Sequence, residues 1–178
     1  DEPQRITSLT VMDIVPTHHL LDELHQSVAK AYYHWFFLAQ PAPFPETLIA
    51  ADPDYFYQSC LLGWGAAKLE QFPANQLQAY RLAWRNPETM RGMCEDYRAA
   101  LIYDFDVDAM DLDRKLTCPA LVLSGADGVM DQMFDMQSVW ASRLEDMRHI
   151  AVRGGHFFVD QNPDETLTHL KGFLNSKP

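Results

Sequence analysis

A histidine on a glycine loop is the residue in this sequence best placed for acid–base chemistry. His156 follows Gly154 and Gly155, which in turn follow an apolar, strand-like segment at residues 147–152. In open α/β sheets the carboxyl ends of the strands border the ligand site, and glycines let a loop approach closely enough to aim an imidazole into it. We therefore predict that His156 is a general base, although a surface histidine in a glycine turn would show the same pattern.

A histidine base needs an acid that orients its ring, because a hydrogen bond to one ring nitrogen fixes the tautomer and stabilises the imidazolium form. Three aspartates compete for this role. Asp13 ends the first predicted strand, whereas Asp127 and Asp131 lie in the loop after a predicted strand at residues 118–125. Asp13 could equally be a capping or loop residue, so these patterns leave the choice of acid open.

The elements that would position these residues indicate an α/β fold. Buried strands of the parallel type are predicted at residues 6–15, 118–125 and 147–152. Helices are predicted at residues 20–39, 54–64, 76–84, 87–101, 133–144 and 163–174, with an acidic loop at residues 104–113.

The first two strands are separated by roughly a hundred mostly helical residues, far more than an ordinary crossover contains. We therefore predict a partial α/β core at residues 1–17 and 112–178 and an inserted helical cap at residues 18–111. Three strands are few for such a sheet. The chain also begins at Asp1 without a methionine, so we expect that an N-terminal portion is missing.

The charge balance argues against nucleic-acid and membrane partners. The 178 residues carry 14 basic and 25 acidic side chains, and the net charge of −11 repels nucleic acids and anionic membrane surfaces. We therefore expect neither a nucleic-acid nor a membrane partner. An anionic substrate would need arginines placed locally in its pocket.

The cysteines and histidines indicate neither a disulfide framework nor a metal site. Cys60, Cys94 and Cys118 are widely spaced and odd in number, so a reducing, cytoplasmic compartment is expected. No secretory signal and no apolar run long enough to span a bilayer is visible. Four histidines also share a short window, but their spacing matches no helical zinc-binding pattern: His18, His19, His25 and His34.

Four segments resemble the haloacetate (fluoroacetate) dehalogenases of the α/β-hydrolase superfamily. They are residues 11–17 (VMDIVPT), 33–43 (YHWFFLAQPAP), 93–99 (MCEDYRA) and 155–157 (GHF). The likeness covers essentially the whole chain and is most specific where the His-Trp pair runs into Gln-Pro-Ala-Pro. It implies an α/β-hydrolase fold of which this chain holds the last three strands and the cap. It also implies a cofactor-independent hydrolase whose partner is a short 2-haloacid.

The resemblance implies a role for each matched residue. In that family an aspartate carboxylate displaces the halide from the α-carbon, and water activated by a histidine–aspartate pair hydrolyses the resulting ester. By matching motifs, His156 would be the base and Asp13 its acid. Donors aimed at the departing halide would be His34, Trp35 and Tyr97, whose N–H and O–H groups are of the required type.

Some of these residues also have a structural explanation. Trp35 in an apolar helical run and Tyr97 on a helix would commonly be packing residues. Trp64 matches a family position in the pocket wall, but packing alone would also account for it.

The chain departs from the family pattern at the nucleophile. The family's nucleophilic aspartate lies on a strand-to-helix elbow, followed by arginines that clamp the substrate carboxylate, ahead of the segment where this chain begins. No Gly-x-Asp-x-Gly or Gly-x-Ser-x-Gly motif occurs in these residues. The nearest string, residues 125–128 (GADG), lies where many hydrolases carry the triad acid, so Asp127 remains an alternative to Asp13. We expect the chain alone to be inactive.

Two other functions fit parts of the pattern. An epoxide hydrolase uses a similar aspartyl ester and could use Tyr97, but it has no need of His34 and Trp35. A non-catalytic module that binds a small ligand would not need His156. If the neighbour of the first strand is absent, an unpaired apolar edge would also promote association, so a homodimer is possible.

Overall fold

The computed structural model describes residues 3–22, 24–63 and 67–176. These residues form two compact units. The first unit holds the described residues of Asp1–Pro16, Trp64–Ala67 and Asp111–Pro178, and the second holds those of Thr17–Gly63 and Lys68–Met110. The division into core and cap that we expect from the sequence stays a prediction about what these parts do.

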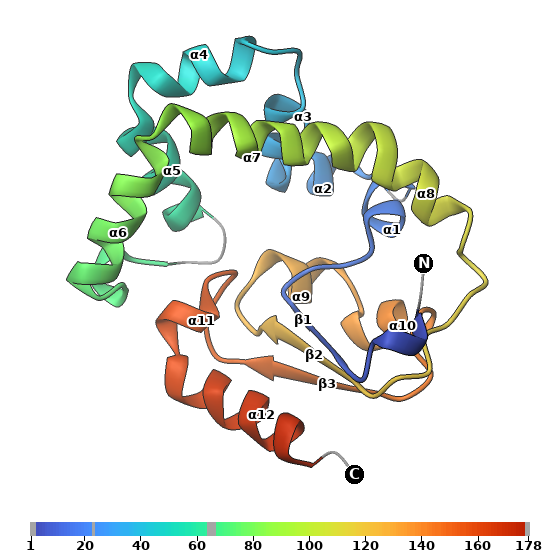
Figure 1. Ribbon diagram of the computed structural model, residues 1–178. Helices are drawn as coiled ribbons and strands as arrows, with labels where there is room; N and C mark the ends of the chain where they lie inside the picture. The colour runs from blue at the N-terminus through green and yellow to red at the C-terminus, as the bar shows by residue number, and fades with distance from the viewer. Residues whose placement is uncertain (1–2, 23, 64–66, 177–178) are drawn as a thin grey trace. The chain divides into compact units, whose positions relative to one another are not determined.

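A parallel three-stranded sheet forms the centre of the first unit (Figure 1). The strands lie in the order β1 (Leu9–Met12), β2 (Ala120–Gly125) and β3 (Met147–Val152). Every residue of β2 is buried, as expected for the middle strand of a covered parallel sheet. The first strand is shorter than predicted, because the chain leaves the extended conformation at Asp13, where φ is 50°. The third strand matches its prediction.

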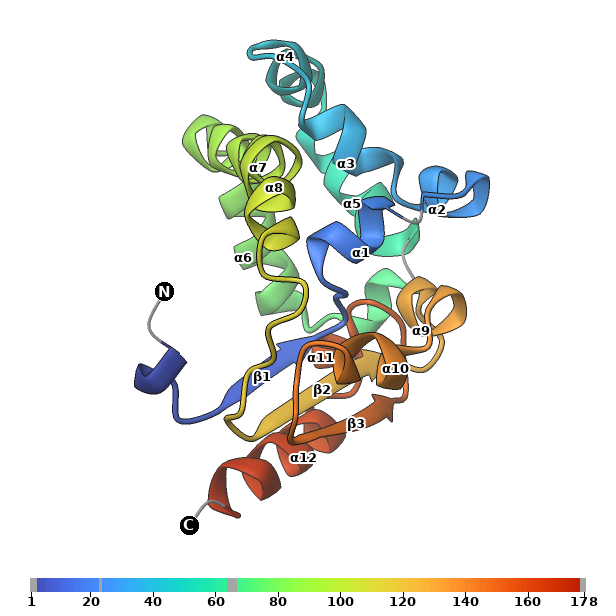
Figure 2. The same ribbon diagram turned by 90° about the vertical axis from the view of Figure 1, so that its right-hand side faces the viewer.

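Helices cover both faces of this sheet. Leu121 and Leu123 of β2 pack with Phe158 of α11 (Phe158–Gln161) and Phe173 of α12 (Pro163–Asn175) in a buried core. The opposite face is covered by α9 (Val129–Met133) and α10 (Met136–Ala141), as Figure 2 shows. A short 3₁₀ helix, η1 (Pro3–Arg5), precedes β1.

The helix predicted near residues 133–144 is present as α10, with shorter bounds, whereas α9 was not predicted. Asp135 lies between them and accepts a hydrogen bond from the Ser138 amide at 3.1 Å, which caps a new helix. The prediction for α12 is confirmed.

The second unit is helical throughout its regular structure. Its elements are α1 (Thr17–Asp22), α2 (Gln26–Ala31), α3 (Tyr33–Leu38), α4 (Phe44–Ala51), α5 (Pro53–Gly63), η2 (Leu69–Gln71), α6 (Ala74–Trp84), α7 (Pro87–Ala99), the π-helix η3 (Ala100–Asp104) and α8 (Phe105–Ala109). The predicted helices at residues 54–64, 76–84 and 87–101 correspond to α5, α6 and α7. Pro87 follows Asn86, whose side chain accepts from the Glu88 amide at 3.0 Å, so α7 has a standard helix start.

Three predictions in this unit are wrong. The helical pattern at residues 20–39 is broken into short helices instead of one. Residues 44–51, where no helix is predicted, form α4, because Pro45 lies in its first turn, where a missing N–H has no cost. The acidic segment 104–113 is helical over most of its length, where His18 stacks on Phe105 with ring centroids 4.7 Å apart. Within the described residues, no helix has both the length and the apolar character that a membrane span requires.

Candidate active site

The loop after β3 holds His156 in a fixed turn. Gly154 has φ of 118°, and a Cβ there would lie 2.7 Å from Gln161 Oε1, so only glycine fits without strain. The same Gln161 oxygen accepts a hydrogen bond from the Gly155 amide at 2.7 Å. His156 therefore lies beyond the carboxyl end of a strand, as predicted.

Asp13 follows β1 at the neighbouring part of the sheet edge. Its amide donates to the Leu123 carbonyl at 2.8 Å, and its Oδ1 accepts from the Gly125 amide at 2.8 Å. Asp13 is 3% exposed. A buried carboxylate needs such hydrogen bonds, because they replace the water that it loses.

The two residues meet directly. His156 Nδ1 lies 2.6 Å from Asp13 Oδ2. Since a carboxylate can only accept hydrogen bonds, Nδ1 carries a proton and Nε2 is the nitrogen that can act as a base. The imidazole is 34% exposed while the carboxylate is 2% exposed, so the ring can meet a solute while its partner stays shielded from water.

A close backbone approach fixes the distance between the two loops. A Cβ on Gly125 would lie only 2.1 Å from the Gly155 carbonyl oxygen. The Asp127 amide also donates to the Gly154 carbonyl at 2.9 Å. This role of Gly125 could not be predicted, because nothing local in the sequence shows which other loop a glycine approaches.

The other two candidate acids lie elsewhere. Asp127 is exposed, and the ring nitrogen of His156 that an acid would orient already contacts Asp13. Asp131 lies in α9 and accepts a hydrogen bond from Ser124 Oγ at 2.6 Å. The acid in contact with His156 Nδ1 is therefore Asp13.

Within the second unit, the three predicted halide donors lie together. His34 and Trp35 belong to α3, and Tyr97 belongs to α7. The Tyr97 ring centroid lies 5.8 Å from that of His34 and 5.4 Å from that of Trp35, both edge to face. Burial raises the pKa of Tyr97 to about 12, with smaller contributions from Cys60 and Asp96, so its phenol keeps its proton. Trp64 lies outside the described residues.

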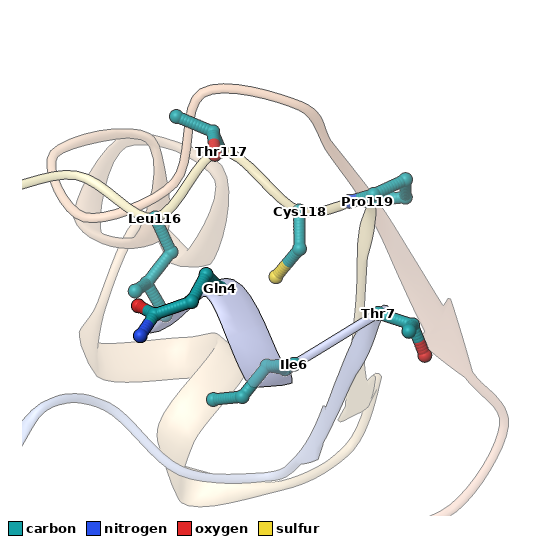
Figure 3. A pocket seen from close by; sticks show the side chains of 7 residues that line it. All are labelled: Gln4, Ile6, Thr7, Leu116, Thr117, Cys118 and Pro119. Atoms are coloured by element: carbon teal, nitrogen blue, oxygen red, sulfur yellow. The ribbon is translucent and has the colours of Figure 1, made fainter. Parts of the chain in front are cut away.

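A cavity of about 410 Å³ in the first unit lies away from His156 and Asp13 (Figure 3). It is lined by Gln4, Ile6 and Thr7, which precede β1, and by residues 116–119, which precede β2. Because the strands are parallel, these residues lie at the end of the sheet opposite to His156. No group of three or more His, Cys, Asp or Glu side chains suited to a metal ion occurs in the part of the chain that is described.

No protein-family profile matches the chain. The chain is 51% identical over 175 residues to a fluoroacetate dehalogenase from Burkholderia sp, a match that covers 98% of this chain and 58% of the relative. The chain therefore spans less than two thirds of the length of that relative. The resemblance expected from the sequence motifs is confirmed.

Solved structures show the same fold. A proposed α/β hydrolase from Nostoc sp PCC 7120 superposes with a TM-score of 0.93 at 38% identity, covering 98% of this chain and 60% of that one. A proposed acyltransferase from Salmonella enterica gives 0.92 at 34%, covering 99% and 58%. A proposed epoxide hydrolase from Pseudomonas aeruginosa gives 0.88 at 34%, covering 99% and 59%. The predicted fold class, a partial α/β-hydrolase fold with a parallel sheet, is confirmed.

Proposed function

We propose that this chain supplies the water-activating and halide-binding residues of a hydrolase that cleaves the carbon–halogen bond of a short 2-haloacid such as fluoroacetate. The observation that supports it most is the 2.6 Å contact between His156 Nδ1 and the buried carboxylate of Asp13. The 51% identity to the Burkholderia dehalogenase supports the choice of substrate. A binding module would have no need of this pair.

The first unit would carry out ester hydrolysis. His156 Nε2 takes a proton from water as the water oxygen attacks the carbonyl carbon of an aspartyl ester. The acyl C–O bond breaks, the hydroxy acid leaves with the proton that His156 held, and the aspartate returns as a carboxylate with release of one proton. Asp13 holds the ring and stabilises its positive charge in between.

The second unit would bind the halide. Fluoride leaves carbon with the bonding electron pair, and the developing charge needs hydrogen-bond donors. His34, Trp35 and Tyr97 have such donors on adjoining rings, and the raised pKa of Tyr97 keeps its O–H in place. We propose Trp64 as a wall of the substrate pocket on the resemblance alone.

The resemblance implies a nucleophile and carboxylate-binding arginines, but the motifs that carry them do not occur in residues 1–178. The test is therefore a chimaera in which this chain replaces the matching 175 residues of the Burkholderia dehalogenase. We expect it to release fluoride from fluoroacetate, measured with a fluoride electrode. His156→Gln should slow turnover by about 10²–10⁴-fold and let the ester accumulate, which intact-protein mass spectrometry detects.

Two results would overturn this proposal. The first is a folded chimaera, verified by circular dichroism and gel filtration, that releases no halide from fluoro-, chloro- or bromoacetate. The second is full turnover in the His156→Gln chimaera. His169→Gln, a change on α12 outside the proposed machinery, is the matched control and should leave turnover unchanged.

Epoxide hydrolysis is the second candidate, favoured by the likeness to the Pseudomonas structure. Joint replacement of His34 by Leu and Trp35 by Phe distinguishes the two reactions. Dehalogenation should be lost, because two halide donors are gone. The second candidate would be favoured if the chimaera released no fluoride before the change and hydrolysed an epoxide such as styrene oxide both before and after it.

A further inference from the structure

A second group of chemically active side chains surrounds Ser124, the residue before Gly125. Ser124 Oγ donates a hydrogen bond to Asp131 Oδ1 at 2.6 Å, and His149 Nε2 lies 2.8 Å from the same Ser124 oxygen. Ser124 is the last residue but one of β2, His149 belongs to β3 and Asp131 belongs to α9. The cluster therefore joins three elements of the first unit.

The hydrogen bonds fix which ring nitrogen of His149 carries a proton. A hydroxyl has one hydrogen, and that of Ser124 is directed at the Asp131 carboxylate, which can only accept. Ser124 Oγ must then accept from His149, so Nε2 is the protonated nitrogen. His149 Nε2 also lies 3.7 Å from Asp131 Oδ1, close enough to add to the attraction.

The residue types are those of a hydrolytic triad, but the arrangement cannot act as one. In a triad the histidine takes the serine proton on one nitrogen and donates to the acid from the other. Here His149 Nε2 faces both Ser124 and Asp131, and the Ser124 hydroxyl already donates its hydrogen bond to Asp131. Ser124 is also fully buried, so no substrate reaches its oxygen.

We infer that Ser124, His149 and Asp131 are positioning residues that hold the Gly125 amide on Asp13, an inference that rests on the proposed role of Asp13 in catalysis. We call this group the Ser124 latch. Gly125 directly follows Ser124, and its amide donates to Asp13 Oδ1 at 2.8 Å. Through this latch, the side chain of Ser124 is bound to β3 by His149 and to α9 by Asp131.

The direction of the Gly125 amide matters because Asp13 has few other supports. Gly125 holds Oδ1 while His156 holds Oδ2, so a turn of the peptide between Ser124 and Gly125 would let the carboxylate rotate away from the imidazole. Gly125 has no side chain of its own to resist such a turn. Pairing with β3 and the hydrogen bond from the Gly128 amide to the Gly125 carbonyl resist part of such a turn, and the three side chains of the latch add to that resistance.

The first test uses the 178-residue chain and needs no activity. Long-range ¹H–¹⁵N correlation spectra should show His149 protonated at Nε2 near neutral pH, with the signal identified by its loss in His149→Gln. A ring protonated only at Nδ1 would overturn the inference, because Ser124 would then donate to His149 instead of to Asp131.

Amide hydrogen exchange tests the effect on Gly125. We expect His149→Phe and Asp131→Leu to speed exchange of the Gly125 amide at least about tenfold, because a hydrogen bond to a charged group is weakened. His149→Gln keeps an N–H at the Nε2 position and Asp131→Asn keeps an acceptor, so both should restore slow exchange. Thr166→Val removes another buried hydroxyl on α12 and serves as control.

The outcomes separate local from general effects. Faster exchange at Gly125 relative to Val122 in the middle of β2, absent in Thr166→Val, supports the latch. Equal acceleration across β2 in all variants, or no change at Gly125, would overturn it.

A kinetic test in the chimaera then connects the latch to the reaction. His149→Phe should slow only the second step, so halide appears in a burst of about one equivalent per protein and the ester accumulates, while His149→Gln behaves like the parent. Loss of the halide burst itself, with normal Gly125 exchange, would count against the latch. If the parent chimaera released no halide, the proposed function would be contradicted, and the latch would then be tested by the Gly125 exchange rates alone.

Discussion

Asp13 meets the imidazole of His156 from a backbone conformation that most residues avoid. Its φ of 50° lies in the left-handed region, which costs a residue with a side chain roughly 1–2 kcal/mol. The amides of Asp13 and Gly125 hold this conformation through hydrogen bonds to the Leu123 carbonyl and to Oδ1. Strain of this kind persists where the surrounding structure determines it, and here it aims one carboxylate oxygen at one ring nitrogen.

Asp13→Asn should separate geometry from chemistry. Asparagine tolerates the left-handed region and its Oδ1 can still accept from Gly125, so the stability of the chain should change by no more than about 1 kcal/mol in urea unfolding. Its amide group would offer an N–H to His156 Nδ1 and favour the wrong tautomer, so ester hydrolysis in the chimaera should fall by about 10²–10⁴-fold. The exposed Asp113→Asn is the control. Turnover within twofold or so of the parent would contradict the assigned role.

Gly125→Ala should damage the fold itself. The new Cβ would meet the Gly155 carbonyl oxygen at 2.1 Å, and that oxygen belongs to the backbone, so one loop must move. We expect a loss of about 1–3 kcal/mol in the free energy of unfolding, measured with urea. Gly172→Ala on α12 meets nothing within 4 Å and should instead stabilise the chain by about 0.5–1 kcal/mol. Equal effects at the two glycines would contradict this interpretation.

Much of the fold and the base–acid pair could be predicted because their signals are local. The apolar run of β3 and the proline start of α12 mark elements within a few residues, and the glycines before His156 mark a loop. The choice of Asp13 over Asp127 needed more, since both follow a strand. What decided it was the pairing of β1 with β2, which brings Asp13 to the Gly125 amide.

Contacts set by strand register and helix docking could not be predicted in the same way. Ser124 and His149 meet because Val122 of β2 lies opposite His149 of β3, a register that no local pattern records. The acidic segment suggested a loop on composition, yet the His18 amide donates to Asp108 at 3.1 Å and helps to hold that stretch in a helix. In the acidic segment, tertiary partners override the local preference.

Acid should weaken the contact between α5 and α6 through Asp54. Hydrogen bonds from Arg85 and Trp84 lower the pKa of Asp54 to about 2. A carboxylate whose folded pKa is depressed stabilises the fold above its unfolded value of about 3.9, and that contribution is lost as the pH falls towards 2. Urea unfolding between pH 5 and 2 should therefore show a steeper loss of stability in the parent chain than in Asp54→Asn. Parallel curves would contradict this linkage.

The nearly buried ion pair between Arg98 and Glu46 should contribute more to stability than an exposed pair on the same helix. Arg98 Nη2 lies 2.7 Å from Glu46 Oε1, with side-chain exposures of 11% and 16%. Arg98 also donates to the Gln40 carbonyl, just after the helix that carries Trp35, at 2.8 Å. Within the described residues Glu46 Oε2 has no hydrogen-bond partner, so its charge depends on Arg98.

Arg98→Met should therefore leave a buried charge uncompensated and lower the free energy of unfolding by about 3–5 kcal/mol. The double variant Arg98→Met, Glu46→Leu should recover part of this loss, because no buried charge remains. Arg91→Met breaks an exposed pair with Glu88, whose side chains are 64% and 74% exposed, and should cost less than about 1 kcal/mol. Urea unfolding of the four chains completes the comparison. If Arg98→Met cost no more than Arg91→Met, or if the double variant were the least stable, the pair would not have the role assigned to it.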